Sequence, residues 1–231
     1  MGVSRAHIED WSPLDPAEHR RQFASLRRRL AGRGSPRVLD LGCGAGRLAE
    51  PLTRAGCRVL GVDLDQAAIA ACSNIGIQTL KGDAFGSGAS ADRTWRTISK
   101  RGPYDAALCL GNTFLLVWKP EDGRTLFERA AANLRRGGIL VLDDFSSLWR
   151  EVAEGNWQEG VSPDGKTQLV WADNDNVLAL RHGRAVNRGS WRLQRSDRPM
   201  RLWSMGELTL LAKGAGFKPP RVSGGLSVFT L

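Results

Sequence analysis

The sequence predicts an α/β fold, with a doubly wound and mostly parallel sheet and an antiparallel β insertion. Three observations predict it. Short apolar runs alternate with helical patterns at the spacing of right-handed β–α–β crossovers. Some runs, such as Ile139–Asp143, are almost continuously apolar, as in strands covered on both faces. After about residue 150, short alternating stretches separated by Asp-Gly, Asn-Asp-Asn and Arg-Gly interrupt this pattern, which is typical of antiparallel hairpins.

The first half of the chain alternates helices and strands. An opening helix is expected because Asp15 suits the N-cap and Pro16 suits the first helical position. The expected strands are Arg37–Leu41, Arg58–Val62, Gln78–Lys81, Tyr104–Leu110 and Ile139–Asp143. The helices expected between them are Leu48–Ala55, Ala67–Asn74, a helix in the second half of Ser87–Ser99, and Asp122–Leu134, closed by Arg135-Arg136-Gly137-Gly138.

The second half predicts the insertion and then a return to the α/β pattern. Residues 157–195 contain TQLVWA, NVLALRHGRAV and SWRLQR, each expected to be part of an antiparallel arrangement. Ser204–Ala215 predicts a helix, because Ser204 and Glu207 have the spacing of a capping box. Leu226–Leu231 predicts a final strand.

Composition limits the class of protein. The 231 residues are 42% hydrophobic, with no apolar run long enough for a membrane span and no apolar signal segment at the start. The four cysteines form no C-x-x-C pair and lie in apolar segments, which predicts buried thiols in a reducing cytoplasm. The net charge of +9 comes mostly from arginines near the start and in 181–201. That charge indicates either a solvated surface or an anionic partner.

Alternating glycines follow the first expected strand, in VLDLGCGAGRL. Gly42, Gly44 and Gly46 allow positive φ and a close approach of the backbone to a ligand. In a doubly wound sheet, ligands bind at the carboxyl ends of the strands. The spacing differs from the dinucleotide motif, because Arg47 occupies the place of its third glycine. Asp40 precedes the loop and places a carboxylate beside it.

Acidic residues end the next two strands. Asp63 lies 21 residues after Gly42, where a carboxylate accepts both hydroxyls of a ribose. Asp83 ends the third strand, where it can accept a hydrogen bond from an amino group such as that of adenine. A single strand-end Asp is also a common turn residue. Three acids at successive strand ends favour a ligand site over turns alone.

On these residues the chain resembles the class I S-adenosylmethionine-dependent methyltransferases. Asp40–Gly46 matches their first motif, Asp63 their ribose acid and Asp83 their adenine-side acid. LRRGGILVLDD and LWSMGELTLLAKGAGF match their fifth-strand motif and their C-terminal helix. The resemblance implies a seven-stranded Rossmann-like sheet and S-adenosyl-L-methionine as the cofactor. The cofactor-binding residues that it implies are Asp40, Gly42, Cys43, Gly44, Gly46, Asp63, Leu64, Gly82, Asp83, Ala84, Leu110 and Gly111, with Trp11 and Arg20 from the N-terminal segment.

A narrower similarity concerns the acceptor. CLGNTF and GGILVLDDF are similar to the glycine/sarcosine and sugar-amine N-methyltransferase branch, whose Asn at this turn helps to hold the acceptor. Where that branch continues with His-Leu, this chain has Phe-Leu-Leu-Val-Trp, which indicates an apolar or aromatic pocket wall. The family's β insertion is a substrate lid. The substrate-binding residues expected here are Asn112, Phe114, Trp118, Asp144, Phe145, Trp149 and Arg181.

The resemblance also implies a division of the chain into four segments. They are an N-terminal helical cap at 1–36, the cofactor-binding core at 37–148, the β-rich lid at 149–200, and a helix with strands that completes the core at 201–231.

Methyl transfer is an in-line displacement at the sulfonium methyl group, for which the protein supplies orientation, desolvation and, where needed, a base. We expect Asn112 and His182 to be the catalytic residues. The other candidate bases are His7, His19, and Asp143 or Asp144. The two adjacent acids lack an evident third ligand, so no metal is expected.

Three functions remain open from the sequence. The first is a cytoplasmic methyltransferase that modifies nitrogen or oxygen of a small acceptor, anionic or aromatic, as a monomer or homodimer. The second is a nucleic-acid methyltransferase, which the charge favours. The Leu-Gly-Asn-Thr turn argues against it, because base-modifying members carry an Asn/Asp-Pro-Pro-aromatic turn there. The third is a cofactor-binding protein without transferase activity.

Overall fold

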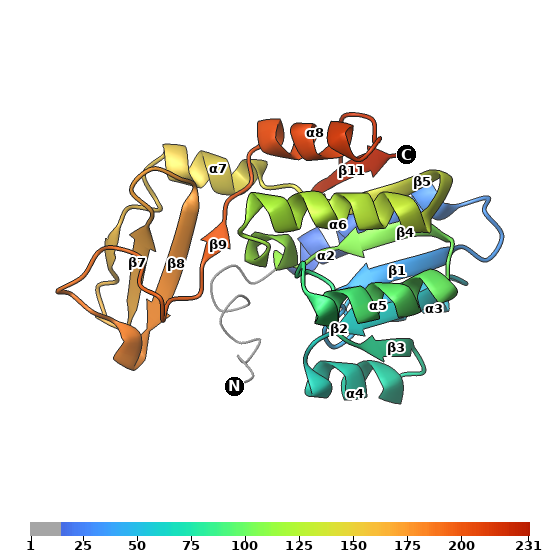
Figure 1. Ribbon diagram of the computed structural model, residues 1–231, viewed down its shortest axis with the longest axis horizontal. Coiled ribbons are helices and arrows are strands. Elements are labelled where there is room, and N and C mark those ends of the chain that lie inside the picture. The colour runs from blue at the N-terminus through green and yellow to red at the C-terminus, as the bar shows by residue number, and fades with distance from the viewer. Residues whose placement is uncertain (1–14) are drawn as a thin grey trace.

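A seven-stranded sheet forms the centre of the molecule (Figure 1). This computed structural model describes residues 15–231. The strand order is β10-β11-β5-β4-β1-β2-β3, so the order reverses between β1 and β4. The parallel strands are β1 (Arg37–Leu41), β2 (Arg58–Asp63), β3 (Gln78–Lys81), β4 (Tyr104–Cys109) and β5 (Leu134–Asp143). Antiparallel to β5 runs β11 (Leu226–Thr230), which also pairs with β10 (Arg221–Val222). The predicted fold class is confirmed.

Helices cover both faces of this sheet, because its strands are apolar on both sides. One hydrophobic cluster packs α5, α6 and α8 on one face, and a second packs α2, α3 and α4 on the other. The helices are α2 (Pro16–Leu30), α3 (Ala49–Arg54), α4 (Gln66–Asn74), α5 (Ala89–Lys100), α6 (Pro120–Asn133), α7 (Ser146–Ala153) and α8 (Met205–Gly214), with short 3-10 turns η1 (Thr113–Leu116) and η2 (Gly183–Ala185). Within residues 15–231 no helix combines the length and the apolar character needed to cross a membrane.

Two helix starts were predicted from capping residues and are confirmed. The Asp15 side chain accepts a hydrogen bond from the backbone N–H of Ala17 at 3.0 Å, which begins α2. Ser204 and Glu207 form a reciprocal capping box at the start of α8.

A separate four-stranded antiparallel sheet, here called the lid sheet, consists of β6 (Gly160–Val161), β7 (Thr167–Trp171), β8 (Val177–His182) and β9 (Met200–Arg201). It stands beside the ends toward which the arrows of β1 and β4 point (Figure 1). The stretch SWRLQR, expected to be part of the antiparallel arrangement, is not a strand. Side chains satisfy its backbone instead, since Arg181 donates to the carbonyls of Ser190 and Arg192.

One strand boundary and one helix also differ from the prediction. β5 begins at Leu134, where a turn through 135–138 was expected, because Leu134 pairs with Tyr104 before a bulge in the ladder. The helix α7 was not anticipated at all.

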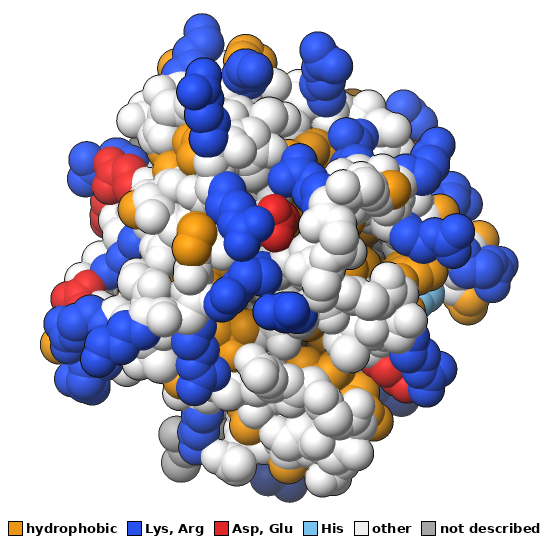
Figure 2. Space-filling model, turned by 90° about the vertical axis from the view of Figure 1, so that its right-hand side faces the viewer, with side chains coloured by type: hydrophobic (Ala, Val, Ile, Leu, Met, Phe, Trp, Pro, Cys, Tyr) orange, Lys and Arg blue, Asp and Glu red, His pale blue; other side chains and the backbone are white. Residues whose placement is uncertain are grey.

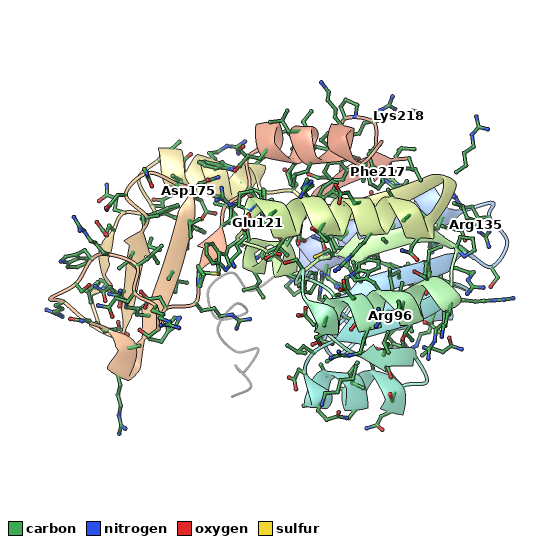
Figure 3. All side chains as sticks on the ribbon, in the orientation of Figure 1. Arg96, Glu121, Arg135, Asp175, Phe217 and Lys218 are labelled. Atoms are coloured by element: carbon green, nitrogen blue, oxygen red, sulfur yellow. The ribbon has the colours of Figure 1, made fainter. Side chains whose placement is uncertain are left out.

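Arg201 joins the lid sheet to the core. Its guanidinium lies buried, with Nε donating to the carbonyl of Trp118 at 2.7 Å. Nη1 and Nη2 bind Glu207 of α8 at 2.9 Å and Asp175 of the β7–β8 turn at 2.5 Å. Asp175 is labelled in Figure 3, on the side of the lid that faces α8. One cation therefore ties three segments together, and losing one partner would leave buried charge unpaired.

Trp203 fills the space just behind that junction. Its ring lies 5.0 Å from the ring of Phe114, and its indole N–H donates to the carbonyls of Phe114 and Val117. Gly123 of α6 makes room for it, because a Cβ there would approach Trp203 to 2.8 Å. A glycine inside a helix usually lowers stability, so its presence here reflects packing.

We expect Gly123→Ala to lower the free energy of unfolding by about 1 kcal/mol or more, since overpacking outweighs the gain in helix propensity. Urea denaturation measures the change. Gly214→Ala is the matched control, because a Cβ at that helical position meets nothing within 4 Å. Equal stability of the two variants would contradict the packing argument.

Candidate active site

The glycine loop after β1 is shaped by contacts on both sides. The backbone N–H groups of Gly42 and Cys43 donate to the carbonyl of Val62 at 2.8 and 3.1 Å. Gly42 has φ +73°, and a Cβ there would lie 2.6 Å from the methyl group of Thr113. Position 42 therefore needs glycine both for its conformation and for the approach of η1.

Asp63 holds the other side of the glycine loop. Its Oδ2 accepts the N–H of Gly44 at 2.8 Å, and its Oδ1 accepts the N–H of Asp65 at 2.9 Å. A carboxylate offers about four acceptor positions, so two remain for the hydroxyls of a ribose. The neighbouring Leu64 is 66% exposed and offers an apolar surface at the same strand end.

Asp83 is engaged in its own turn. Its Oδ1 accepts the N–H groups of Phe85 and Gly86 at 2.9 and 3.2 Å. Oδ2 accepts none of the hydrogen bonds made by the described residues. Gly82 donates to the carbonyl of Asp63, and the Ala84 carbonyl accepts the indole N–H of Trp95. Asp83 therefore acts as a turn residue, and its contact with adenine stays a prediction.

The cysteines beneath the loop are structural. The Cys43 and Cys72 sulfur atoms lie 3.8 Å apart, and a Cβ at Gly61 would meet the Cys43 sulfur at 2.8 Å. Burial, with the nearby Asp40 carboxylate second, raises the pKa of the Cys43 thiol. Because this side chain packs beneath the loop, it does not face a ligand.

The exit of β4 is fixed by Asp143, the last residue of β5. Its two oxygens accept the backbone N–H of Asn112 at 2.8 Å and of Gly111 at 3.3 Å. Asn112 has φ +59°, a left-handed conformation that Asn tolerates better than most residues. No described residue hydrogen-bonds to the Asn112 side-chain amide, whereas its backbone is held firmly.

A network of hydrogen bonds extends from Asp143 to the N-terminal helix, α2. Gln22 of α2 donates to Asp143 at 3.2 Å and accepts from Arg47 at 3.1 Å. The same Arg47 nitrogen lies 3.2 Å from Nδ1 of His19. Gln22 and Arg47 were not predicted from the sequence as site residues. The signal was weak, since only the three-residue spacing of His19 and Gln22 places both on one helix face.

Burial shifts the pKa values of two groups in this hydrogen-bond network. It raises the pKa of Asp143 to about 6, even though the N–H of Asn112, the charge of Arg47, the N–H of Gly111 and the Gln22 amide all act to lower it. Burial, with Arg47 and Arg20 next, lowers the pKa of His19. A neutral His19 can accept a hydrogen bond from Arg47, and an ionised Asp143 can accept both backbone N–H groups at the β4 exit.

A methyltransferase domain family matches residues 17–220. The chain belongs to this family. It is a class I S-adenosylmethionine-dependent methyltransferase, as the motifs predicted, and S-adenosylmethionine is its cofactor. A ubiquinone biosynthesis O-methyltransferase of Bradyrhizobium diazoefficiens is 30% identical over 182 residues, covering 71% of this chain and 67% of that protein. A cypemycin N-terminal methyltransferase of Streptomyces is 27% identical over 163 residues, covering 69% and 61%.

Two solved structures show the same fold. A sugar N-methyltransferase from Streptoalloteichus has a TM-score of 0.63 at 19% identity, covering 100% of this chain and 93% of that one. An amino pentose methyltransferase from Micromonospora echinaspora, solved with S-adenosylmethionine bound, has a TM-score of 0.57 at 19% identity, covering 100% and 98%. By contrast, the methyltransferase spans about two thirds or less of the length of the curated relatives, for example 60% of a second ubiquinone biosynthesis O-methyltransferase.

The residues of the methyltransferase fit its cofactor. The glycines of the loop have positive φ, Asp63 keeps acceptor capacity beside it, and the unengaged Asn112 amide lies at the exit of β4. Trp11 and His7 lie outside the described residues. Arg20 is exposed on α2, whereas His19 and Gln22 of the same helix contact the site, so its cofactor contact stays a prediction.

The structure corrects two of the predicted acceptor residues of the methyltransferase. Phe114 is fully buried, with its ring packed against Phe127 and Trp203, so it lies in the core and does not line a pocket. Arg181 is 2% exposed and binds Asp197 through two nitrogens at 2.8 and 2.7 Å. A buried and paired guanidinium has no donor left for a substrate.

The remaining predicted residues are spread over several elements. Asp144 accepts from the backbone and hydroxyl of Ser146, the first residue of α7, while Phe145 packs into the core. Trp149 donates its indole N–H to the carbonyl of Trp203. Trp118 is 36% exposed, which leaves its ring accessible.

His182 ends β8 opposite Thr167. It lies five residues beyond the end that pairs with β9, or about 16 Å along the strand. The structure therefore does not bring it to the strand ends that hold Asp63 and Asn112.

We expect Asp63→Ala to weaken binding of S-adenosylhomocysteine by roughly tenfold or more, because two ribose acceptors and the anchor of Gly44 are lost together. Isothermal titration calorimetry measures the dissociation constant. Asp65→Asn retains the N-cap of α4 and serves as the control. An unchanged affinity in Asp63→Ala refutes the ribose assignment.

Asp143 predicts a pH dependence of cofactor binding. Below its pKa of about 6 the carboxyl gains a proton and loses acceptor capacity, so the β4 exit loosens as the pH falls. If only the ionised form binds, affinity for S-adenosylhomocysteine at about pH 5 is on the order of tenfold weaker than at pH 8. Asp143→Asn should abolish this loss of affinity at low pH, whereas Asp144→Asn should retain it. If the affinity of Asp143→Asn still fell at low pH, another group would be responsible.

Proposed function

We propose that this methyltransferase transfers the methyl group of S-adenosylmethionine to a nitrogen or oxygen of a small-molecule metabolite, held at the exit of β4 by Asn112. One observation carries the proposal: the Asn112 backbone is fixed by Asp143 while its side-chain amide has no hydrogen-bond partner among the described residues. A polar side chain so positioned, and mostly buried, is suited to orient an acceptor.

In this proposal the chain supplies position rather than a reactive group. The bound cofactor supplies an activated methyl sulfonium. Asp63 and the loop from Gly42 to Gly46 hold the nucleoside side, and the Asn112 amide aligns the acceptor atom. The lid sheet, tied to the core through Arg201, excludes water from the acceptor side. Placement of His182 within the lid gives it no part in this mechanism.

The side chains available on the acceptor side narrow the chemical class of the acceptor. Arg181, the lid arginine predicted to bind the acceptor, is already paired with Asp197. Trp118 stays partly exposed, with the Lys119 ammonium 5.4 Å from its ring, and is suited to pack against an aromatic or other flat acceptor. The names of the relatives include both O- and N-methyltransferases, which supports either atom.

The test uses Asn112→Gly, because glycine removes the amide and adopts φ +59° without strain. Wild-type protein is screened with methyl-labelled S-adenosylmethionine against phenols, catechols, and primary and secondary amines. We expect Asn112→Gly to lower kcat/KM for the accepted compound by about tenfold or more while binding of S-adenosylhomocysteine stays within about threefold.

Asn74→Gly, at the exposed end of α4, is the matched control. Full activity of Asn112→Gly would remove Asn112 from the acceptor site. Tight cofactor binding with no transfer to any compound class would favour a cofactor-binding protein without transferase activity.

A further inference from the structure

The end of the sheet opposite the active site is strongly basic. Six segments meet there: 31–37, 54–58, 74–78, 99–103, 133–138 and 213–221. They contain no Asp or Glu. Their eleven cationic residues, here called the basic edge, are Arg33, Arg37, Arg54, Arg58, Lys100, Arg101, Arg135, Arg136, Lys213, Lys218 and Arg221. Figure 2 views the molecule from this side, where Lys and Arg side chains prevail over Asp and Glu.

Most of this charge is not neutralised within the protein. Arg54 pairs with Glu50, and Arg33 and Arg135 share Asp105 at 3.7 and 3.4 Å. The other eight members of the edge form no ion pair with any described residue. Figure 3 labels two members, Arg135 and Lys218, at the same end of the molecule although they are far apart in sequence.

Helix dipoles explain only part of the pattern. Arg54, Lys100 and Lys213 occupy last turns of helices, where a cation is favourable. Arg58 and Arg221 begin strands instead, and Arg101 and Lys218 lie in connections. Gathering like charges there opposes folding through mutual repulsion, so a partner that uses the charge is the more economical explanation.

A cleft lies within the basic edge. Its volume is about 370 Å³, and three of its lining residues are Arg37, Arg58 and Arg101. The Arg37 guanidinium lies 5.8 Å from the centre of the Tyr104 ring, which holds it at the wall. The floor is made of side chains at the starts of the parallel strands, such as Val59 and Ile77. Three arginines around an open cleft supply the type of donor that pairs with phosphate oxygens.

We propose that the basic edge binds the phosphodiester backbone of a nucleic acid, with the cleft receiving one nucleotide unit. Eight of the eleven cations are Arg, whose planar fork pairs with phosphate in a bidentate manner. A membrane surface fits less well, because the large apolar side chains well exposed in or near these segments, Ile75, Leu210 and Val222, are scattered over separate elements and do not form an amphipathic helix face to insert.

This binding is separate from methyl transfer. The basic edge and the Asp63–Asn112 site lie at opposite ends of the parallel strands, and the five residues of β1 alone span about 16 Å. The nucleic acid is therefore a docking partner and not the methyl acceptor. Binding of S-adenosylhomocysteine stays unchanged when the edge is altered.

Fluorescence anisotropy with labelled oligomers of about 20 units, one single-stranded RNA and one duplex DNA, tests the proposal in buffers from about 50 to 200 mM KCl. We expect measurable binding that weakens steeply with salt. The edge variant Arg58→Gln/Arg101→Gln/Arg136→Gln should bind at least about tenfold more weakly and lower the RNA salt slope by roughly 2, since each lost phosphate contact removes about 0.7.

The control variant Arg150→Gln/Arg188→Gln/Arg195→Gln removes the same charge from exposed positions on α7 and in or beside the lid sheet. It should retain affinity within about threefold. Equal weakening of both variants would reduce the effect to net charge and overturn the proposal. So would absence of binding to both oligomers at low salt. Equal affinity for polyglutamate, or binding only to phosphatidylglycerol vesicles, would assign the edge to an acidic protein or a membrane and overturn it as well.

Discussion

The buried carboxylate of Asp143 is the group on which the rest of the active site depends. It ends β5, and its hydrogen bonds reach the β4 exit and the N-terminal helix at once. Without an acceptor there, the N–H groups of Gly111 and Asn112 would lose their partner, and an unpaired N–H at the buried Asn112 would cost about 1–3 kcal/mol. Two strands, one helix and, through Gln22, the glycine loop at Arg47 are thereby held in one arrangement.

A second junction fixes the lid in the same manner. Arg201 links the β7–β8 turn, α8 and the segment after η1, and Trp203 packs behind it against Phe114. Phe114 follows directly after the Asn112–Thr113 turn. The packing of the lid therefore reaches the acceptor side through only a few contacts, which explains why residues expected to touch an acceptor instead form this support.

The two ends of the sheet carry opposite charge. Asp40, Asp63, Asp83 and Asp143 lie at the carboxyl ends of four parallel strands, and the basic edge lies at the other ends. A net charge of +9 thus does not describe the surroundings of the cofactor. The arginines of 181–201, which suggested an anionic substrate, are not part of the basic edge, and the lid arginine expected to bind the acceptor, Arg181, is paired with Asp197.

The sequence by itself determined the fold, the helix caps and the family, because these depend on local patterns: strand periodicity, capping residues, and glycines and acids at strand ends. The substrate and catalytic residues could not be predicted as well. Whether Phe114 faces a pocket or the core, whether Arg181 is free, and where His182 lies are decided by contacts between residues distant in sequence. The network of Asp143, Gln22 and Arg47 exists only because folding brings α2 against the β4 exit.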